Sequence, residues 1–84
     1  MYEYAKDLRE TEVWDRASNT VYAVWFTTDR EEDYNGRRYT VVTVERAAVG
    51  DPATGEDVEV DLDHETAERL AEVIGERLDN GGML

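Results

Sequence analysis

The sequence predicts an α+β fold, in which a three- to four-stranded, mainly antiparallel sheet carries one C-terminal amphipathic helix packed on one face. Two segments, 20–28 and 37–46, are rich in β-branched and aromatic residues, as strands are. A third segment, 57–62, strictly alternates acidic and apolar residues, which is typical of a strand with one solvated face. Residues 63–79 then repeat apolar side chains at helical spacing.

The chain of 84 residues fits one small domain over 1–84. Residues 1–12 show no dominant pattern, because the spacing of Tyr4 and Leu8 is weakly helical while an arm or an edge strand fits equally well. We therefore expect an arm, an edge strand or a short helix over 1–12, the sheet over 20–62, the helix over 63–79 and a tail over 80–84.

The first two predicted strands form a hairpin with two unresolved features. Asn35-Gly36 is a strong signal for a two-residue type I′ turn, which would place Asp33 opposite Arg38. A longer acidic loop over 29–33 is the alternative. Apolar residues also occur at both parities of the strand 20–28, so both sheet faces are expected to be covered. The helix would cover one face, and the N-terminal segment or a second copy in a homodimer would cover the other.

The third strand and the helix have clear signals at their ends. The alternation directs Val58, Val60 and Leu62 inward, and Asp63 is a good N-cap. Asn80-Gly81-Gly82 ends the helix because Asn and Gly accept the left-handed conformation. Gly75 is unfavourable inside a helix, and a close approach to the sheet would explain it. The apolar stripe of the helix consists of Ala67, Leu70, Ala71, Ile74 and Leu78.

The opposite side of this helix carries the strongest functional signal. Carboxylates recur at steps of three and four residues, so they share one narrow face. A solvated helix face explains such a row, and so does a surface offered to Arg and Lys side chains of a partner. The expected partner-binding residues are Glu65, Glu68, Glu72, Glu76 and Asp79 on the helix, with Asp57, Glu59 and Asp61 beside them.

The charge balance supports a basic partner. The chain has 9 basic and 21 acidic residues, a net charge of −12. Such a surface repels nucleic-acid phosphates and anionic membranes. No apolar run approaches the roughly 18 residues of a membrane span, and no N-terminal stretch resembles a signal peptide. We therefore expect a cytoplasmic protein without membrane contact.

No pattern in the sequence predicts an enzyme, a cofactor or a metal. There is no Cys, one His and one Ser, so neither a catalytic triad nor a Cys-ligated zinc is indicated. The acidic alternation from Asp57 superficially matches a calcium loop, but Leu62 stands where that loop requires Gly. We expect no catalytic residues, no cofactors and no metal ligands.

A locally basic, aromatic hairpin predicts the alternative function, single-stranded nucleic-acid binding through stacking and phosphate contacts. The element order over about residues 20–78 also resembles that of single-stranded-DNA-binding transcriptional coactivators, although this chain has acidic residues before its helix where that family has basic ones. The residues of this alternative are Arg37, Arg38, Tyr39, Arg46 and Trp25.

The leading functional expectation is a non-enzymatic acidic module that binds a basic protein surface. A concrete version is a nucleic-acid-mimic inhibitor of the counter-defence or antitoxin kind, which would occupy a basic groove. Besides the nucleic-acid alternative, a small salt-adapted housekeeping domain also explains abundant acid with a single lysine, Lys6.

Overall fold

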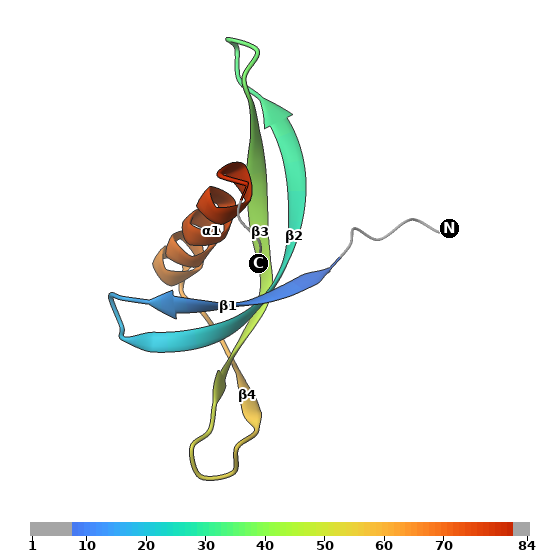
Figure 1. Cartoon of the computed structure of the whole chain (residues 1–84). Coiled ribbons are helices and arrows are strands. Elements are labelled where there is room, and N and C mark those ends of the chain that lie inside the picture. The colour runs from blue at the N-terminus through green and yellow to red at the C-terminus, as the bar shows by residue number, and fades with distance from the viewer. Residues whose placement is uncertain (1–7, 82–84) are drawn as a thin grey trace.

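The computed structural model describes residues 8–81 and confirms the α+β prediction. One antiparallel sheet has the strand order β1-β2-β3-β4, and the helix lies across one face of it (Figure 1). Within residues 8–81, no helix is long and apolar enough to cross a membrane. The elements are β1 (Arg9–Asp15), β2 (Thr20–Glu32), β3 (Arg38–Gly50), β4 (Asp57–Val60) and α1 (His64–Asp79).

The first strand resolves part of the ambiguity at the N-terminus. Residues from Arg9 onward form an edge strand that pairs with β2, from Arg9 opposite Phe26 to Asp15 opposite Thr20. The sheet therefore begins before residue 20, and the expectation of a sheet over 20–62 was too short. The alternatives for residues 1–7 lie outside the described residues.

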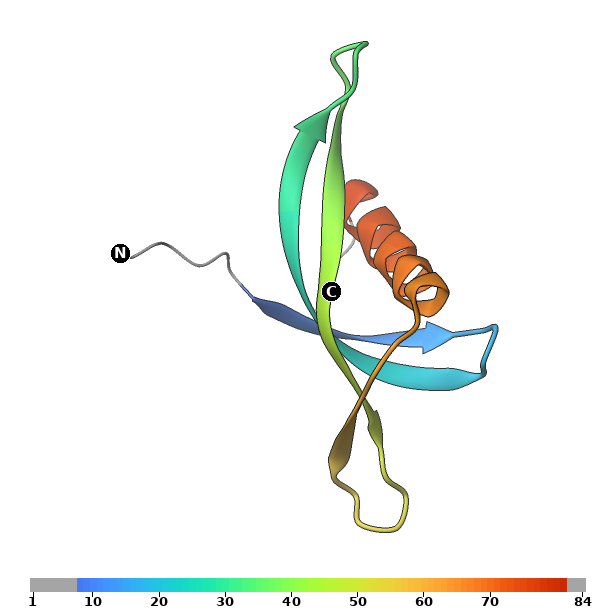
Figure 2. The same cartoon turned by 180° about the vertical axis from the view of Figure 1, so that it is seen from behind.

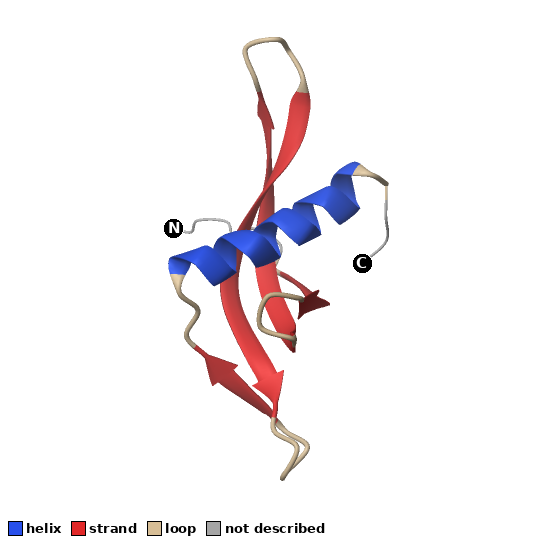
Figure 3. Ribbon diagram, turned by 90° about the vertical axis from the view of Figure 1, so that its left-hand side faces the viewer, coloured by secondary structure: helices blue, strands red, loops and turns tan. Residues whose placement is uncertain are grey.

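The central hairpin is longer than predicted. β2 and β3 have 13 residues each, about 43 Å at the rise of a strand, whereas the 16 residues of α1 span about 24 Å. The hairpin end therefore extends past the helix (Figure 3). The acidic segment 29–32 continues β2, because pairing with β3 satisfies its backbone despite the low strand propensity of its residues.

The hairpin turn differs from the predicted two-residue turn. Glu32, and not Asp33, lies opposite Arg38. The Asp33 backbone N–H donates to the Arg37 carbonyl at 2.9 Å, and three residues lie between them. The Asp33 carboxylate accepts the backbone N–H groups of Asn35 and Arg37, and Gly36 takes a φ of 83°. This side-chain capping favours a type I turn followed by a left-handed glycine over the expected type I′ turn.

A bulge bends the sheet at its centre. Trp25 pairs with Arg46 and Phe26 pairs with Val44, so Glu45 is the extra residue. The half of β2 paired with β1 turns away from the half that leads to the hairpin end, as seen from both sides of the molecule (Figures 1 and 2). The bent hairpin leaves a hollow side against which α1 packs.

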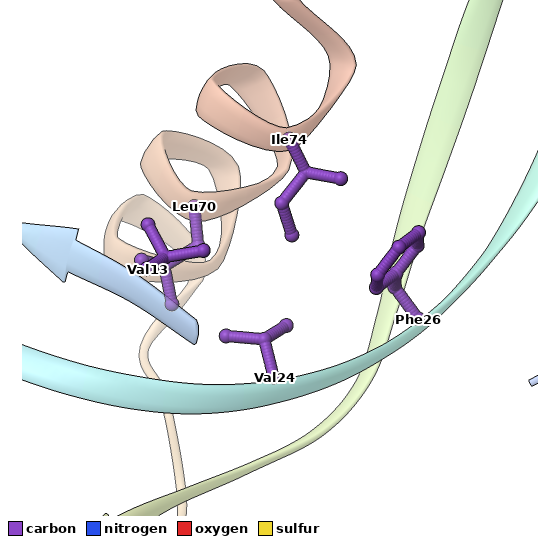
Figure 4. Close-up of a cluster of buried hydrophobic side chains, with 5 residues drawn as sticks. All are labelled: Val13, Val24, Phe26, Leu70 and Ile74. Carbon is purple, nitrogen blue, oxygen red and sulfur yellow. The ribbon is translucent and has the colours of Figure 1, made fainter. Parts of the chain in front are cut away.

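The hydrophobic core lies where this bend meets the helix. Five fully buried side chains form it, and Figure 4 shows those from β1 and β2 directed toward those from α1. Half-buried residues surround them, among them Tyr22, Val42 and Leu62. The buried residues are Val13, Val24, Phe26, Leu70 and Ile74.

The face of the sheet opposite α1, here called the open face, carries no further element of residues 8–81. Its side chains include Val21, Ala23 and Trp25, which alternate with the core residues of β2. No helix or strand within residues 8–81 covers the open face. The expectation that the N-terminal segment or a second copy of the chain covers it therefore stays a prediction.

The strand β4 is shorter than the predicted 57–62 and ends at Val60. Val60 is half-buried and Leu62 packs against the core, as predicted, but Val58 is 47% exposed. Val58 lies on the same face of β4 as Val60, as predicted, but it is not buried there, because α1 begins at His64 and leaves this end of the sheet uncovered.

The helix ends were predicted correctly. Asp63 is the N-cap, and its Oδ1 accepts the Thr66 backbone N–H at 2.9 Å. At the other end the Asn80 N–H donates to the Glu76 carbonyl, and Gly81 takes a φ of 74°.

Candidate protein-interaction surface

Five carboxylates form one exposed row along α1, here called the acidic stripe. The periodicity that buries Leu70 and Ile74 against the sheet turns these residues toward solvent. Every member is exposed, as the sequence predicted, and the row spans about 21 Å along the helix axis. The acidic stripe consists of Glu65, Glu68, Glu72, Glu76 and Asp79.

The acidic stripe has little charge compensation within residues 8–81. Its one ion-pair partner is His64, whose Nε2 lies 3.2 Å from Glu68 Oε2 one turn away, with both side chains exposed. Neighbouring members of the stripe repel one another, because like charges four residues apart destabilise a helix. The stripe is thus an arrangement that the fold tolerates and that a cationic partner would stabilise.

Arg69 lies next to the acidic stripe but binds elsewhere. Its Nε donates to Asp15 Oδ1 at 3.2 Å and its Nη2 to Asp15 Oδ2 at 3.1 Å. This two-pronged bond joins α1 to the end of β1. Asp15 thus binds a residue 54 positions later in the chain, a pairing that no local pattern of the sequence indicates.

The environment of Asp15 favours its charged form. The carboxylate is buried, with 5% of the residue exposed, and the Ser18 hydroxyl donates to it at 2.8 Å. The hydrogen bonds from Arg69 and then from Ser18 lower the pKa of Asp15, while burial opposes them. The same pair raises the pKa of Arg69. The site is a structural tie between β1 and α1.

The remaining predicted partner-binding residues do not join the acidic stripe on one face. Asp57, Glu59 and Asp61 are exposed. Glu59 pairs across the sheet with Ala48, which places its side chain on the open face, where its Oε1 lies 3.9 Å from Arg46 Nε. Asp57, two residues before, shares that face. The helix residues alone form a continuous acidic surface.

The residues of the nucleic-acid alternative are divided between two places. Arg37, Arg38 and Tyr39 lie at the hairpin end, where the Tyr39 hydroxyl donates to Glu31 Oε1 at 3.3 Å. The negative charge of Glu31 raises the pKa of Tyr39. Arg46 lies about 27 Å farther along β3.

At that second place, the Arg46 guanidinium stacks over the Trp25 ring, 4.8 Å from its centroid. The ring is therefore already covered by a cation on one side. The sequence predicted that these residues lie close together because it indicated that the two strands pair as a hairpin. It did not indicate how long that hairpin is. The structure assembles no continuous basic, aromatic groove from them.

The chemistry-bearing side chains have partners of their own. His64 is exposed and bound to Glu68, while Ser18 donates to Asp15 on the β1–β2 turn. Within residues 8–81 no group of three or more His, Cys, Asp or Glu side chains could hold a metal ion.

Among the features that sequence reasoning missed is a hollow of about 490 Å³ between α1 and the end of β1. Its lining includes residues 14–17 at the end of β1 and, from α1, Glu72, Val73 and Arg77. The apolar residues Val13-Trp14 were a visible signal. Which of the two faces α1 was not visible, because it depends on how β1 pairs: Val13 lies opposite Tyr22 on the core side, and Trp14 lies opposite Val21 on the open face.

Comparisons with known proteins add no assignment: no family model matches the chain, and neither a curated protein nor a solved structure is significantly similar to it.

Proposed function

We propose that the protein is a non-enzymatic interaction module whose acidic stripe binds a basic surface of another protein. The supporting observation is the exposure of five carboxylates in one row with only His64 as an ion-pair partner among residues 8–81. Arg69, the nearest arginine on the helix, is committed to Asp15. Arginine forks of a partner would find bidentate acceptors along the row.

The more specific form of this proposal is inhibition of a nucleic-acid-binding protein. The acidic stripe has about one charge per 5 Å of helix axis, compared with one phosphate per 3.4 Å on each strand of duplex DNA. A groove that binds phosphates with Arg and Lys is therefore a fitting partner. Competition between this protein and duplex DNA for such a groove is the behaviour expected of a mimic.

The test compares two variants with the same change of net charge. The first reverses Glu68, Glu72 and Glu76 to Lys within the acidic stripe. The matched control reverses Glu10, Glu32 and Glu56 to Lys, all exposed and outside α1. Binding of an oligo-arginine peptide is measured by calorimetry at low salt, where surface electrostatics are least screened.

We expect the stripe variant to weaken peptide binding by at least about tenfold and the control by less than about threefold, because local rather than total charge sets a contact. Equal weakening by both variants would contradict the proposal, since only net charge would matter. Thermal unfolding against KCl checks the salt-adaptation alternative, which requires that the protein fold only at multimolar salt.

The nucleic-acid alternative is tested in the same preparation. Filter binding of single-stranded DNA at low salt, with Arg37→Ala plus Arg38→Ala as the comparison, measures it directly. Binding that disappears in this double variant would favour the alternative over the acidic stripe.

A further inference from the structure

The open face of the sheet exposes large apolar side chains where β1 pairs with β2. Trp14 is 53% exposed and Val21 is 52% exposed, and the register puts them directly opposite each other. Val13, the neighbour of Trp14, is fully buried on the side of α1, so the alternation along β1 directs the indole to the open face. The half-buried Ala23 and Trp25 continue this row along β2. An exposed apolar row of this kind is typical of an interaction surface.

The indole of Trp14 is held in place by two contacts. Its Nε1–H donates to Asn19 Oδ1 at 3.2 Å. The Arg16 guanidinium lies over the ring, 5.8 Å from its centroid. A large side chain that is already oriented at the surface loses little conformational entropy when a partner covers it. Trp14 therefore has the properties of a central interface residue.

The charges on the open-face side of β1 change sign across Trp14. Glu10 and Glu12 precede it on this side, and Arg16 follows it. All three are exposed, and neither Glu12 nor Arg16 forms an ion pair within residues 8–81. A two-fold axis that lies between two such faces and crosses β1 at Trp14 reverses the strand direction in the second copy. Arg16 of each copy then lies over Glu12 of the other, so the face is complementary to itself.

We propose that two copies of this chain associate through the part of the open face that β1 and β2 form, with the two-fold axis at Trp14. The indole and Val21 of each copy pack against those of the other, and two ion pairs between Arg16 and Glu12 flank them. A basic partner would meet Arg16 and Arg46 on this face, whereas a second copy brings charges of both signs.

This arrangement keeps the most acidic surfaces of the two copies apart. In each copy α1 lies on the other side of the sheet (Figure 1), and sheets that pack face to face are about 10 Å apart. The two acidic stripes therefore lie on opposite outer sides of the dimer. Association through α1 would instead bring together the stripes of two chains that each have a net charge of −12. The dimer is independent of the proposed function.

Sedimentation velocity measures the association directly. It is followed up to millimolar protein at about 0.15 M KCl, where charges more than about 8 Å apart are screened. We expect a reversible dimer. Trp14→Ser removes the indole and should weaken the association by at least about tenfold. The protein with the reversed acidic stripe should still dimerise, so failure of one proposal does not affect the other.

An exchange of charges tests how the two copies face each other. Arg16→Glu and Glu12→Arg should each weaken self-association by at least about tenfold, because each places like charges together at both contacts. An equimolar mixture of the two variants should dimerise again, since the two new side chains then face each other and so do the two native ones. Net charge alone predicts that Glu12→Arg strengthens the association, because it makes the chain less negative. The matched controls, Arg37→Glu and Glu32→Arg at the hairpin end, should leave it unchanged.

Three results would overturn the inference. A chain that stays monomeric up to millimolar concentration would leave the open face to the N-terminal segment or to a different protein. A dimer that Trp14→Ser leaves intact would form through another surface. A mixture of the two charge variants that associates no better than either variant alone, with the circular dichroism of the folded protein, would show that Arg16 does not face Glu12 of the second copy.

Discussion

The two flanks of α1 differ in what the rest of the molecule does with them. On the flank toward β1, Arg69 binds Asp15 and Arg77 binds the carbonyl of Glu12, next to the buried Leu70. On the outer flank the acidic stripe is exposed, and within residues 8–81 its one ion pair is that of Glu68 with His64. The comparison teaches that folding and the proposed binding use different sides of one helix. Substitutions can therefore separate folding from binding.

The largest expected effect comes from truncating the inner flank. Leu70→Ala removes a side chain that is 1% exposed and leaves a cavity among Val13, Val24 and Ile74. Such truncations cost about 2–5 kcal/mol, which is a large part of the stability of a domain of this size. Urea unfolding followed by circular dichroism measures the loss. Glu72→Ala on the outer flank should change stability by less than about 0.5 kcal/mol. Similar losses of unfolding free energy in the two variants would show that the two flanks of α1 contribute equally to folding.

A smaller effect with a pH signature is expected at the tie between β1 and α1. The pKa of Asp15 is lowered in the folded protein, so the carboxylate contributes stability above its unfolded pKa near 3.9. That contribution is lost as the pH falls through the lower folded value. Asp15→Asn should lower the Tm by several degrees at pH 7, since Arg69 loses its charged acceptor.

The difference between Asp15→Asn and the wild-type protein should shrink as the pH falls below about 4. Measuring that difference cancels the many carboxylates that the two proteins share. A difference in Tm that stays constant from pH 7 to pH 3 would show that the charge of Asp15 does not hold β1 to α1.

The sequence predicted the helix better than the sheet. The signals of α1 are local: Asp63 caps it, one periodic face is apolar, and Asn80-Gly81 ends it. The extension of β2 through its acidic residues depends on pairing with β3, which no local pattern contains. The same holds for β1, whose seven residues become a strand because β2 offers them a partner.

The candidate surfaces differ in the same way: local patterns predict a surface on one element, but not a surface that several elements form together. The acidic stripe lies on one helix, so residue spacing alone was sufficient to predict it. The hollow between α1 and the end of β1 combines residues more than fifty positions apart, so no local pattern could predict it. The residues of the nucleic-acid alternative form no common groove because β3 is extended from Arg38 to Arg46, which separates the two side chains by about 27 Å.

The smallest expected effect lies between the flanks, at Gly75. The sequence suggested a close approach to the sheet there, and a Cβ at this position would lie 3.8 Å from both the Thr40 carbonyl oxygen and Val42 Cγ2. Those are ordinary contact distances, so alanine fits without moving β3. Gly75→Ala should stabilise the protein by about 0.5–1 kcal/mol, because alanine loses less backbone entropy in a helix. Thermal unfolding would show a Tm raised by a few degrees, with peptide binding to the acidic stripe unchanged. A lowered Tm would mean that α1 packs against β3 too closely for even one methyl group, and that the helix is positioned by this contact as well as by its inner flank.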